Sequence, residues 1–140
     1  MLFLDTEFNS HAGQLISLAL VSDRDGHEFY GVLPLPKKIH PWVAEHVIPF
    51  LVKESEAEAV FRGRLAIYLK RHAGEDIVAD WPEDFVHLLN MITMPDGHRV
   101  SVDFTMHLVS DMDTKPEVPH NALSDARALM HAWKVQRDAN

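Results

Sequence analysis

The alternation of hydrophobic and polar residues predicts three strands at the start of the chain. Residues 2–7 form an apolar run interrupted only by two acids and a threonine, and residues 14–23 and 28–33 are the next apolar stretches. The turn-forming residues Asp23-Arg24-Asp25-Gly26 separate the second stretch from the third. We therefore expect these two strands to form an antiparallel hairpin.

Three later segments carry apolar residues at helical spacing. Ser55 and Glu58 have the pattern of a capping box at the start of the first helix. Pro82 is typical of the first turn of a second helix, and a third is expected over about 121–136. The proline-containing stretch before the first of them is expected to be irregular, apart from a short helix at 42–47. The residues expected to face the core are Ala57, Phe61, Leu65, Tyr68 and Leu69 in the first helix, Phe85, Leu88, Leu89 and Ile92 in the second, and Ala122, Ala126, Leu129, Met130 and Trp133 in the third.

Two further strands are expected among these helices. A short strand at 75–80 follows the first helix, and an alternating segment at 99–109 follows the second, before a polar loop at 110–119. The order strand, helix, strand implies a parallel crossover connection, which is expected to be right-handed. Three strands followed by alternating helices and strands predict an α/β domain.

Composition narrows the classes of protein to which the chain can belong. With 140 residues, 46% of them hydrophobic, the chain suits one domain with its own core. It has no apolar run near the roughly 20 residues of a membrane span, and its start lacks the features of a signal peptide. The absence of cysteine suits a reducing compartment, so we expect a cytoplasmic protein with no membrane partner. The net charge of −8 argues against a broad basic face for long nucleic acid, although not against a grip on a few nucleotides.

Asp5 and Glu7 are the first candidates for chemistry. They lie two residues apart in the first predicted strand, so their side chains project from the same face of the sheet. Two carboxylates held side by side in an apolar strand repel each other. A hard divalent cation takes oxygen ligands and offsets that repulsion. The pair therefore predicts a metal site.

A third acid is expected at the end of the strand at 75–80. Asp80 closes that strand, and Asp84 lies close behind it. Either residue is equally typical of a helix cap or of the surface. We favour Asp80 as the site residue because it ends the strand.

His120 and Asp125 flank the start of the last predicted helix. Asn121 is a suitable N-cap, which puts His120 in the loop and Asp125 near the end of the first turn. The helix N-terminus favours the negative charge of Asp125. His120 can point toward an attacking water, and the unperturbed pKa of histidine near neutrality suits a general base.

In this order, Asp5-x-Glu7, Asp80 and His120-x4-Asp125 resemble the three motifs of the DEDDh 3′–5′ exonuclease family. The opening Phe-Leu-Asp-Thr-Glu-Phe and the closing His-Asn-Ala-Leu-Ser-Asp-Ala-Arg-Ala are similar to a small bacterial and mycobacterial exoribonuclease group. The resemblance covers almost the whole chain. It implies a ribonuclease H-like fold, with a mixed five-stranded sheet flanked by helices, in a single exonuclease domain spanning 1–140.

The resemblance also implies a two-metal hydrolase with two Mg²⁺ ions per active site, or Mn²⁺ in their place. Asp5 would bridge both ions, Glu7 and Asp125 would complete the site of the attacking water, and Asp80 would support the second ion directly or through water. His120 would take the proton from that water. The implied products are nucleoside 5′-monophosphates, released from the 3′ ends of single-stranded RNA or from 3′ overhangs.

Substrate contacts and partners follow less directly from the sequence. In the resembled family the region of Phe8 and Asn9 touches the terminal nucleotide, although Phe8 equally suits the core. Trp81 either walls the pocket or is buried before Pro82. The alternatives are a DNA-directed 3′–5′ exonuclease, a hydrolase of dinucleotides or short oligonucleotides, and an inactive nucleic-acid-binding domain. A homodimer is expected because many relatives in the resembled family form one.

Overall fold

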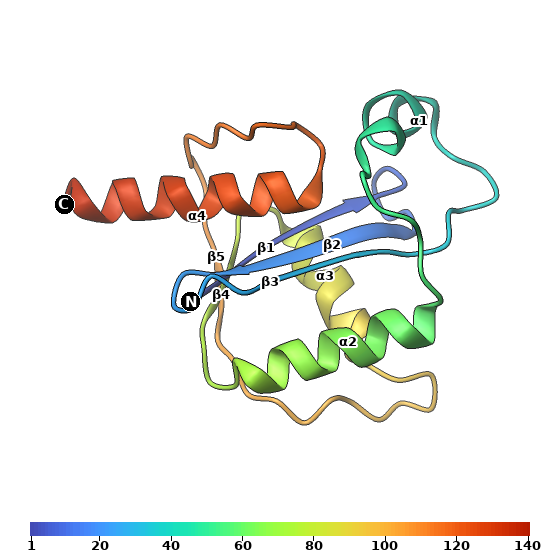
Figure 1. Cartoon of the computed structure of the whole chain (residues 1–140), viewed down its shortest axis with the longest axis horizontal. Coiled ribbons are helices and arrows are strands. Elements are labelled where there is room, and N and C mark those ends of the chain that lie inside the picture. Colours follow the sequence, from blue (N-terminus) through green and yellow to red (C-terminus); the bar gives the residue numbers. More distant parts are fainter.

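A five-stranded mixed sheet forms the centre of the structure, a computed structural model that describes residues 1–140 (Figure 1). Its strands lie in the order β3-β2-β1-β4-β5. β2 runs antiparallel to β1 and β3, whereas β4 runs parallel to β1 and β5. The predicted α/β class, the hairpin and the parallel crossover are therefore confirmed. The strands are β1 (Leu2–Phe8), β2 (Leu15–Ser22), β3 (Glu28–Val32), β4 (Ile77–Ala79) and β5 (Met106–Leu108).

Helices cover both faces of the sheet (Figure 1). The short α1 and the long α4 lie on one face, and α2 and α3 lie on the other. Successive side chains of β1 point to opposite faces of the sheet and contribute to the core on both sides. Leu2 and Leu4 join the core under α2 and α3, whereas Phe3 packs with Leu129 of α4. The helices are α1 (Pro41–His46), α2 (Glu58–Arg71), α3 (Pro82–Met91) and α4 (Ala122–Asp138), with a 3₁₀ turn at Ile48–Phe50.

The prediction of a long strand at 99–109 is wrong over most of its length. Only β5 joins the sheet, and Arg99 forms an isolated bridge with Thr93. Val100 and Val102 are buried in the core under α2 and α3 without extending a strand. Before β5 the backbone of this segment forms hydrogen bonds with Ile92 and Gly74, which lie outside the sheet, so the alternation reflects burial of alternate side chains and not a long strand.

The predicted capping box of α2 is also wrong. The helix begins at Glu58, its N-cap is the exposed Ala57, and no side chain caps its first turn. The preceding backbone is held elsewhere, because the N–H of Glu56 donates to the carbonyl of Val32 on the sheet edge. This bond holds the chain against the sheet edge at Glu56, two residues before the helix begins.

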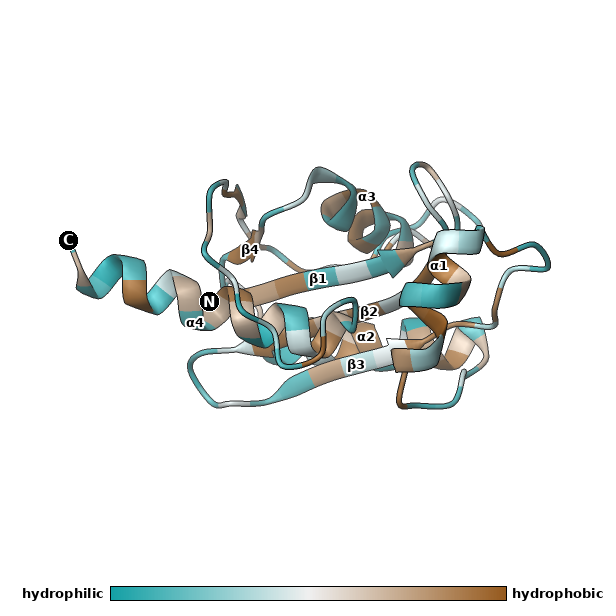
Figure 2. Cartoon of the chain, turned by 90° about the horizontal axis from the view of Figure 1, so that it is seen from above, coloured by the Kyte–Doolittle hydropathy of each residue, from teal (hydrophilic) through white to brown (hydrophobic).

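In α3 the buried face is rotated from the predicted one. Leu89 is 38% exposed, whereas Asp84 and His87 are buried. His87 lies against the ring of Phe8, with the ring centroids 4.8 Å apart. Polar residues on this face of α3 therefore meet the end of β1, which changes from hydrophobic to hydrophilic along its length (Figure 2). No helix of the structure combines the length and the apolar character needed to cross a bilayer.

Candidate active site

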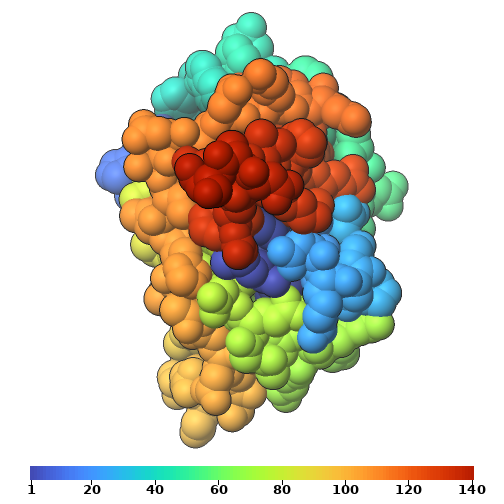
Figure 3. Space-filling model, turned by 90° about the vertical axis from the view of Figure 1, so that its left-hand side faces the viewer, coloured from blue at the N-terminus to red at the C-terminus, as the bar shows by residue number.

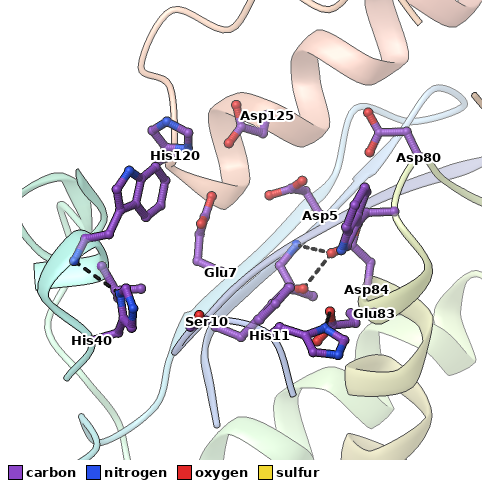
Figure 4. Close-up of a pocket in the computed structure, with 15 residues that line it drawn as sticks. Asp5, Glu7, Ser10, His11, His40, Asp80, Glu83, Asp84, His120 and Asp125 are labelled. Atoms are coloured by element: carbon purple, nitrogen blue, oxygen red, sulfur yellow. Dashed lines mark hydrogen bonds and ion pairs between the residues drawn. The ribbon is translucent and has the colours of Figure 1, made fainter. Parts of the chain in front are cut away.

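The end of β1 positions three side chains of the candidate site. Asp5 and Glu7 project toward the face covered by α4, as the strand period predicts, and Thr6 points to the opposite face toward α3 (Figure 4). One oxygen of Asp5 and one of Glu7 lie within 4.8 Å of each other and of an oxygen of Asp125. The predicted convergence of these three acids is therefore present.

Asp84 enters the site from the first turn of α3. Its Oδ1 accepts hydrogen bonds from the Thr6 hydroxyl at 2.6 Å and from the Thr6 backbone N–H at 3.2 Å. Its Oδ2 is buried and has no hydrogen-bond partner. Asp84 and Asp80, just after β4, each bring an oxygen within 4.8 Å of Asp5. Asp5 therefore belongs to two groups of three carboxylates. One of them contains Asp84, the acid that strand position favours less than Asp80.

Asn121 fixes the start of α4. Its side-chain oxygen accepts a hydrogen bond from the N–H of Ser124 at 3.0 Å, and its amide nitrogen donates to the carbonyl of Phe50 at 2.7 Å. The predicted N-cap is thus confirmed, and Asp125 lies in the first helical turn. Because Asn121 joins α4 to the turn after α1, it holds Asp125 in a fixed position relative to that segment.

His120 lines the same cavity from the loop before α4 (Figure 4). Its backbone is in the left-handed region, with φ of 62°. Its ring meets the edge of Trp42 with ring centroids 4.9 Å apart, and Trp42 in turn stacks on His46 at 4.5 Å. The short helix α1 therefore supports the orientation of His120 through an aromatic contact.

The cavity has a volume of about 730 Å³. Besides the acids and His120, the cavity is lined by residues that the sequence does not single out as site residues: Ser10, His11, His40, Trp42, Val43 and Glu83. The loop after β1 is tied to α3, because Glu83 accepts hydrogen bonds from the ring of His11 at 2.6 Å and from the N–H of Ala12 at 2.9 Å. The sequence did contain one feature that indicates a role for Trp42 in the cavity. A large aromatic residue in the first turn of a short helix has no core of its own to fill.

The three predicted substrate contacts differ in their placement. Phe8 lines the cavity, although its ring also lies against His87. Trp81 lines the cavity and is 57% exposed, so its predicted alternative, a buried tryptophan, is wrong. Asn9 does not line the cavity, and its side chain bonds to the backbone of Lys38 and His40 at 2.8 and 2.7 Å. Asn9 therefore shapes the neighbouring loop.

The acids of the site hold their protons unusually strongly. Burial, followed by the negative charge of Asp125, raises the pKa of Glu7 to about 9. Burial likewise raises the pKa of Asp84 to about 7 and that of Asp125 to about 6. The pKa of Asp5 is raised well above its usual range by burial and then by the charge of Asp84. The site thus carries more buried carboxylate than its own hydrogen-bond donors can satisfy.

These acids fit hard divalent cations. The candidate ligands are all carboxylate oxygens, which suit Mg²⁺ and Mn²⁺. The Oδ2 atoms of Asp5 and Asp84 are buried without any partner, so each has a lone pair free for an ion. The residues present therefore match the cofactor that the sequence predicts.

No protein family model matches the chain, and no curated protein sequence matches it. The family resemblance drawn from the motif residues thus stays a prediction.

Proposed function

We propose that the protein is a metal-dependent 3′–5′ exonuclease of the DEDDh type with a ribonuclease H-like fold, acting on single-stranded RNA ends. One observation carries the proposal: the five carboxylates of two potential cation-binding groups, from β1, α3, α4 and the residue after β4, line one cavity together with His120. The mixed five-stranded sheet with helices on both faces supports the fold assignment. A structural role alone does not account for the site, because buried unpaired carboxylates lower stability.

The two groups of acids provide two candidate cation positions. Asp5, Glu7 and Asp125 form one group, and Asp5, Asp80 and Asp84 form the other. Bound Mg²⁺ or Mn²⁺ would offset the repulsion among these acids and stabilise the charge that develops on a phosphodiester under attack. Because Asp5 is common to both groups, its loss is expected to affect both positions at once.

His120 is the proposed general base. It is the histidine that precedes Asp125 by five residues, and it lines the cavity beside the acids. In this role its ring takes the proton of the attacking water while Asp125 stabilises the resulting imidazolium. The contact with Trp42 restricts the ring, which lowers the entropic cost of reaching the reactive geometry.

The cavity also suits flat, unpaired nucleobases. Trp42 and Trp81 line it with exposed fractions of 46% and 57%, and base stacking on such rings is tolerant of sequence. Several arginines are unavailable for phosphates. Arg64 pairs with Glu56, and Arg127 pairs with Glu28 through two hydrogen bonds. With a net charge of −8, the protein is expected to bind single-stranded ends over a few nucleotides and to bind long duplexes poorly.

A time course on 5′-labelled single-stranded RNA tests the proposal. In Mg²⁺ we expect a ladder that shortens from the 3′ end, and in EDTA no cleavage. Asp5→Asn protein is the matched control, because it keeps the shape of the side chain but removes the shared charge. Chromatography of the products should show nucleoside 5′-monophosphates.

Parallel reactions on matched DNA and on a dinucleotide separate the alternatives. Faster cleavage of DNA would assign a DNA-directed exonuclease, and cleavage of the dinucleotide alone would assign a hydrolase of short oligonucleotides. Intact substrates throughout, in both Mg²⁺ and Mn²⁺, would contradict the proposal of a nuclease.

A further inference from the structure

A second group of potential ligands lies at the opposite end of β1 from the cavity. There the turn between β2 and β3 meets the C-terminal end of α2, next to the start of β1. Figure 3 views this end of the molecule, and the light-blue residues of the turn lie against the green residues of α2. Asp25 and His27 come from the turn, and His72 is the C-cap of α2.

His72 has an unusual set of neighbours. Its side chain is completely buried, and its Nδ1 lies 2.8 Å from the carbonyl oxygen of Tyr68. Its Nε2 lies 3.1 and 3.3 Å from the two carboxylate oxygens of Asp25. Both ring nitrogens therefore face oxygen acceptors. Since a neutral imidazole has only one N–H, the contact with Asp25 needs a positive charge, either a second ring proton or a cation between the two groups.

The geometry of the group suits a cation. In neutral His72 the bond to Tyr68 places the ring proton on Nδ1, and the Nε2 lone pair is then directed at Asp25. The Nδ1 of His27 lies 3.1 Å from the same carboxylate, and one ligand atom from each residue lies within 4.8 Å of the others. Separations of 3.1 to 3.3 Å between Asp25 and the imidazoles are close to the roughly 3.3 Å edge of a tetrahedron with metal–ligand bonds of about 2 Å.

We propose that Asp25, His27 and His72 bind one Zn²⁺ ion, which ties the β2–β3 turn to α2. Two imidazoles and one carboxylate favour zinc over magnesium, whereas the two carboxylate groups in the cavity suit Mg²⁺. The partial exposure of Asp25 and His27 gives the ion a path to solvent and leaves room for water as a fourth ligand.

Two arginines border the site. The guanidinium of Arg24 is 4.0 Å from Asp25, but it also pairs with Glu75 at 3.0 Å, which offsets its charge. The guanidinium of Arg71 is 3.5 Å from the Nε2 of His27, a long contact that opens when the exposed ring turns toward an ion.

Calorimetric titration of Zn²⁺ into EDTA-treated, desalted protein tests the proposal. Excess Mg²⁺ is present throughout to occupy the carboxylates of the cavity. We expect one equivalent of Zn²⁺ to bind, and affinity to fall at least about tenfold in Asp25→Asn and in His27→Gln. Both residues are partly exposed, so these variants should fold, and circular dichroism verifies this. Asp5→Asn is the control and should bind Zn²⁺ like the original protein.

Two results of the same titrations would contradict the proposed zinc site. Absence of Zn²⁺ binding would leave a protonated His72 paired with Asp25 as the explanation of the geometry. Binding that survives in His27→Gln but disappears in Asp5→Asn would assign the ion to the cavity. Neither outcome depends on nuclease activity, so these titrations test the zinc site independently of the proposed function.

Discussion

The position of Asp84 illustrates how a single residue changes the interpretation of the site. It lies one helical turn before Leu88, so it shares the buried face of α3 and points at β1. Strand position alone favours Asp80. The helical period contained the information needed to include Asp84, but only the observed bonds from Thr6 show where its carboxylate lies.

Replacement of Asp84 by asparagine should impair catalysis without unfolding the protein. The amide oxygen can still accept both hydrogen bonds from Thr6, whereas the free anionic oxygen is lost. Turnover in Mg²⁺ is expected to fall at least about 100-fold, because even outer partners of metal sites cost 10- to 100-fold. Asp80→Asn, measured alongside, should lose less, because Asp80 is less buried than Asp84. A fully active Asp84→Asn enzyme would remove Asp84 from the site.

Replacement of His120 by alanine should reduce turnover by about 10² to 10⁴-fold, the usual share of general-base catalysis. Folding and Mg²⁺ affinity should be unchanged, because the proposed ligands are all acids. The control is His98→Ala, since His98 is an exposed residue paired only with Asp96. Rates measured at saturating RNA check the effect, and equal rates in the two variants would exclude His120 as the base.

Among the elements, α4 connects the fold most directly to the chemistry. Its N-cap is bonded both to its own first turn and to the segment after α1, and its first turn carries Asp125. The helix therefore depends on tertiary contacts at the end that enters the site. Loss of these contacts should affect stability and activity together.

Two substitutions of Asn121 separate its helix cap from the bonds that its amide nitrogen donates to Phe50 and Tyr30. Serine retains a capping oxygen but loses the amide that donates to Phe50, and alanine loses both. We expect a loss of about 1 kcal/mol in the free energy of unfolding for serine, because the partly buried carbonyl of Phe50 loses its donor. Alanine should cost about 1 kcal/mol more for the missing cap. Chemical denaturation measures both, and equal losses would show that the cap contributes nothing.

Across the whole molecule, the acids of the cavity should make stability depend on pH and on divalent ions. The pKa of Glu7 is about 9 in the folded protein, above its unfolded value, so folding retains a proton that unfolding releases. Without metal, its contribution to stability is full at low pH and is lost as the pH rises toward 9. Bound Mg²⁺ offsets the charge and should reverse the trend.

Thermal unfolding at pH 7 and pH 9, in EDTA and in Mg²⁺, measures this effect. In EDTA we expect the Tm to fall by about 5 °C, equivalent to about 1–2 kcal/mol for a domain of this size. Burial lowers the pKa of the Met1 amino group, but its bonds to Asp23 and Glu75 outweigh burial, so the pKa is raised overall. This group therefore also loses its contribution to stability as the pH rises. Glu7→Gln is therefore the reference, and its Tm should fall less. An identical fall in both proteins would contradict the assignment to Glu7.

The homodimer that the family resemblance implies stays a prediction. Sedimentation velocity at micromolar concentration, with and without Mg²⁺, distinguishes a species of 15.9 kDa from one of twice that mass.

Local spacing predicts the class of fold, the hairpin, the N-cap of α4 and the acids at the end of β1. An example is the period of two that puts Asp5 and Glu7 on one face. Features that need partners distant in the chain follow only from the packed fold. Thr6 selects the orientation of Asp84, and Trp42 supports His120 from a helix nearly 80 residues away. His72 meets Asp25 only because a crossover returns α2 to the hairpin. Spacing records which face a residue occupies, whereas the contacts across that face exist only once the layers have packed.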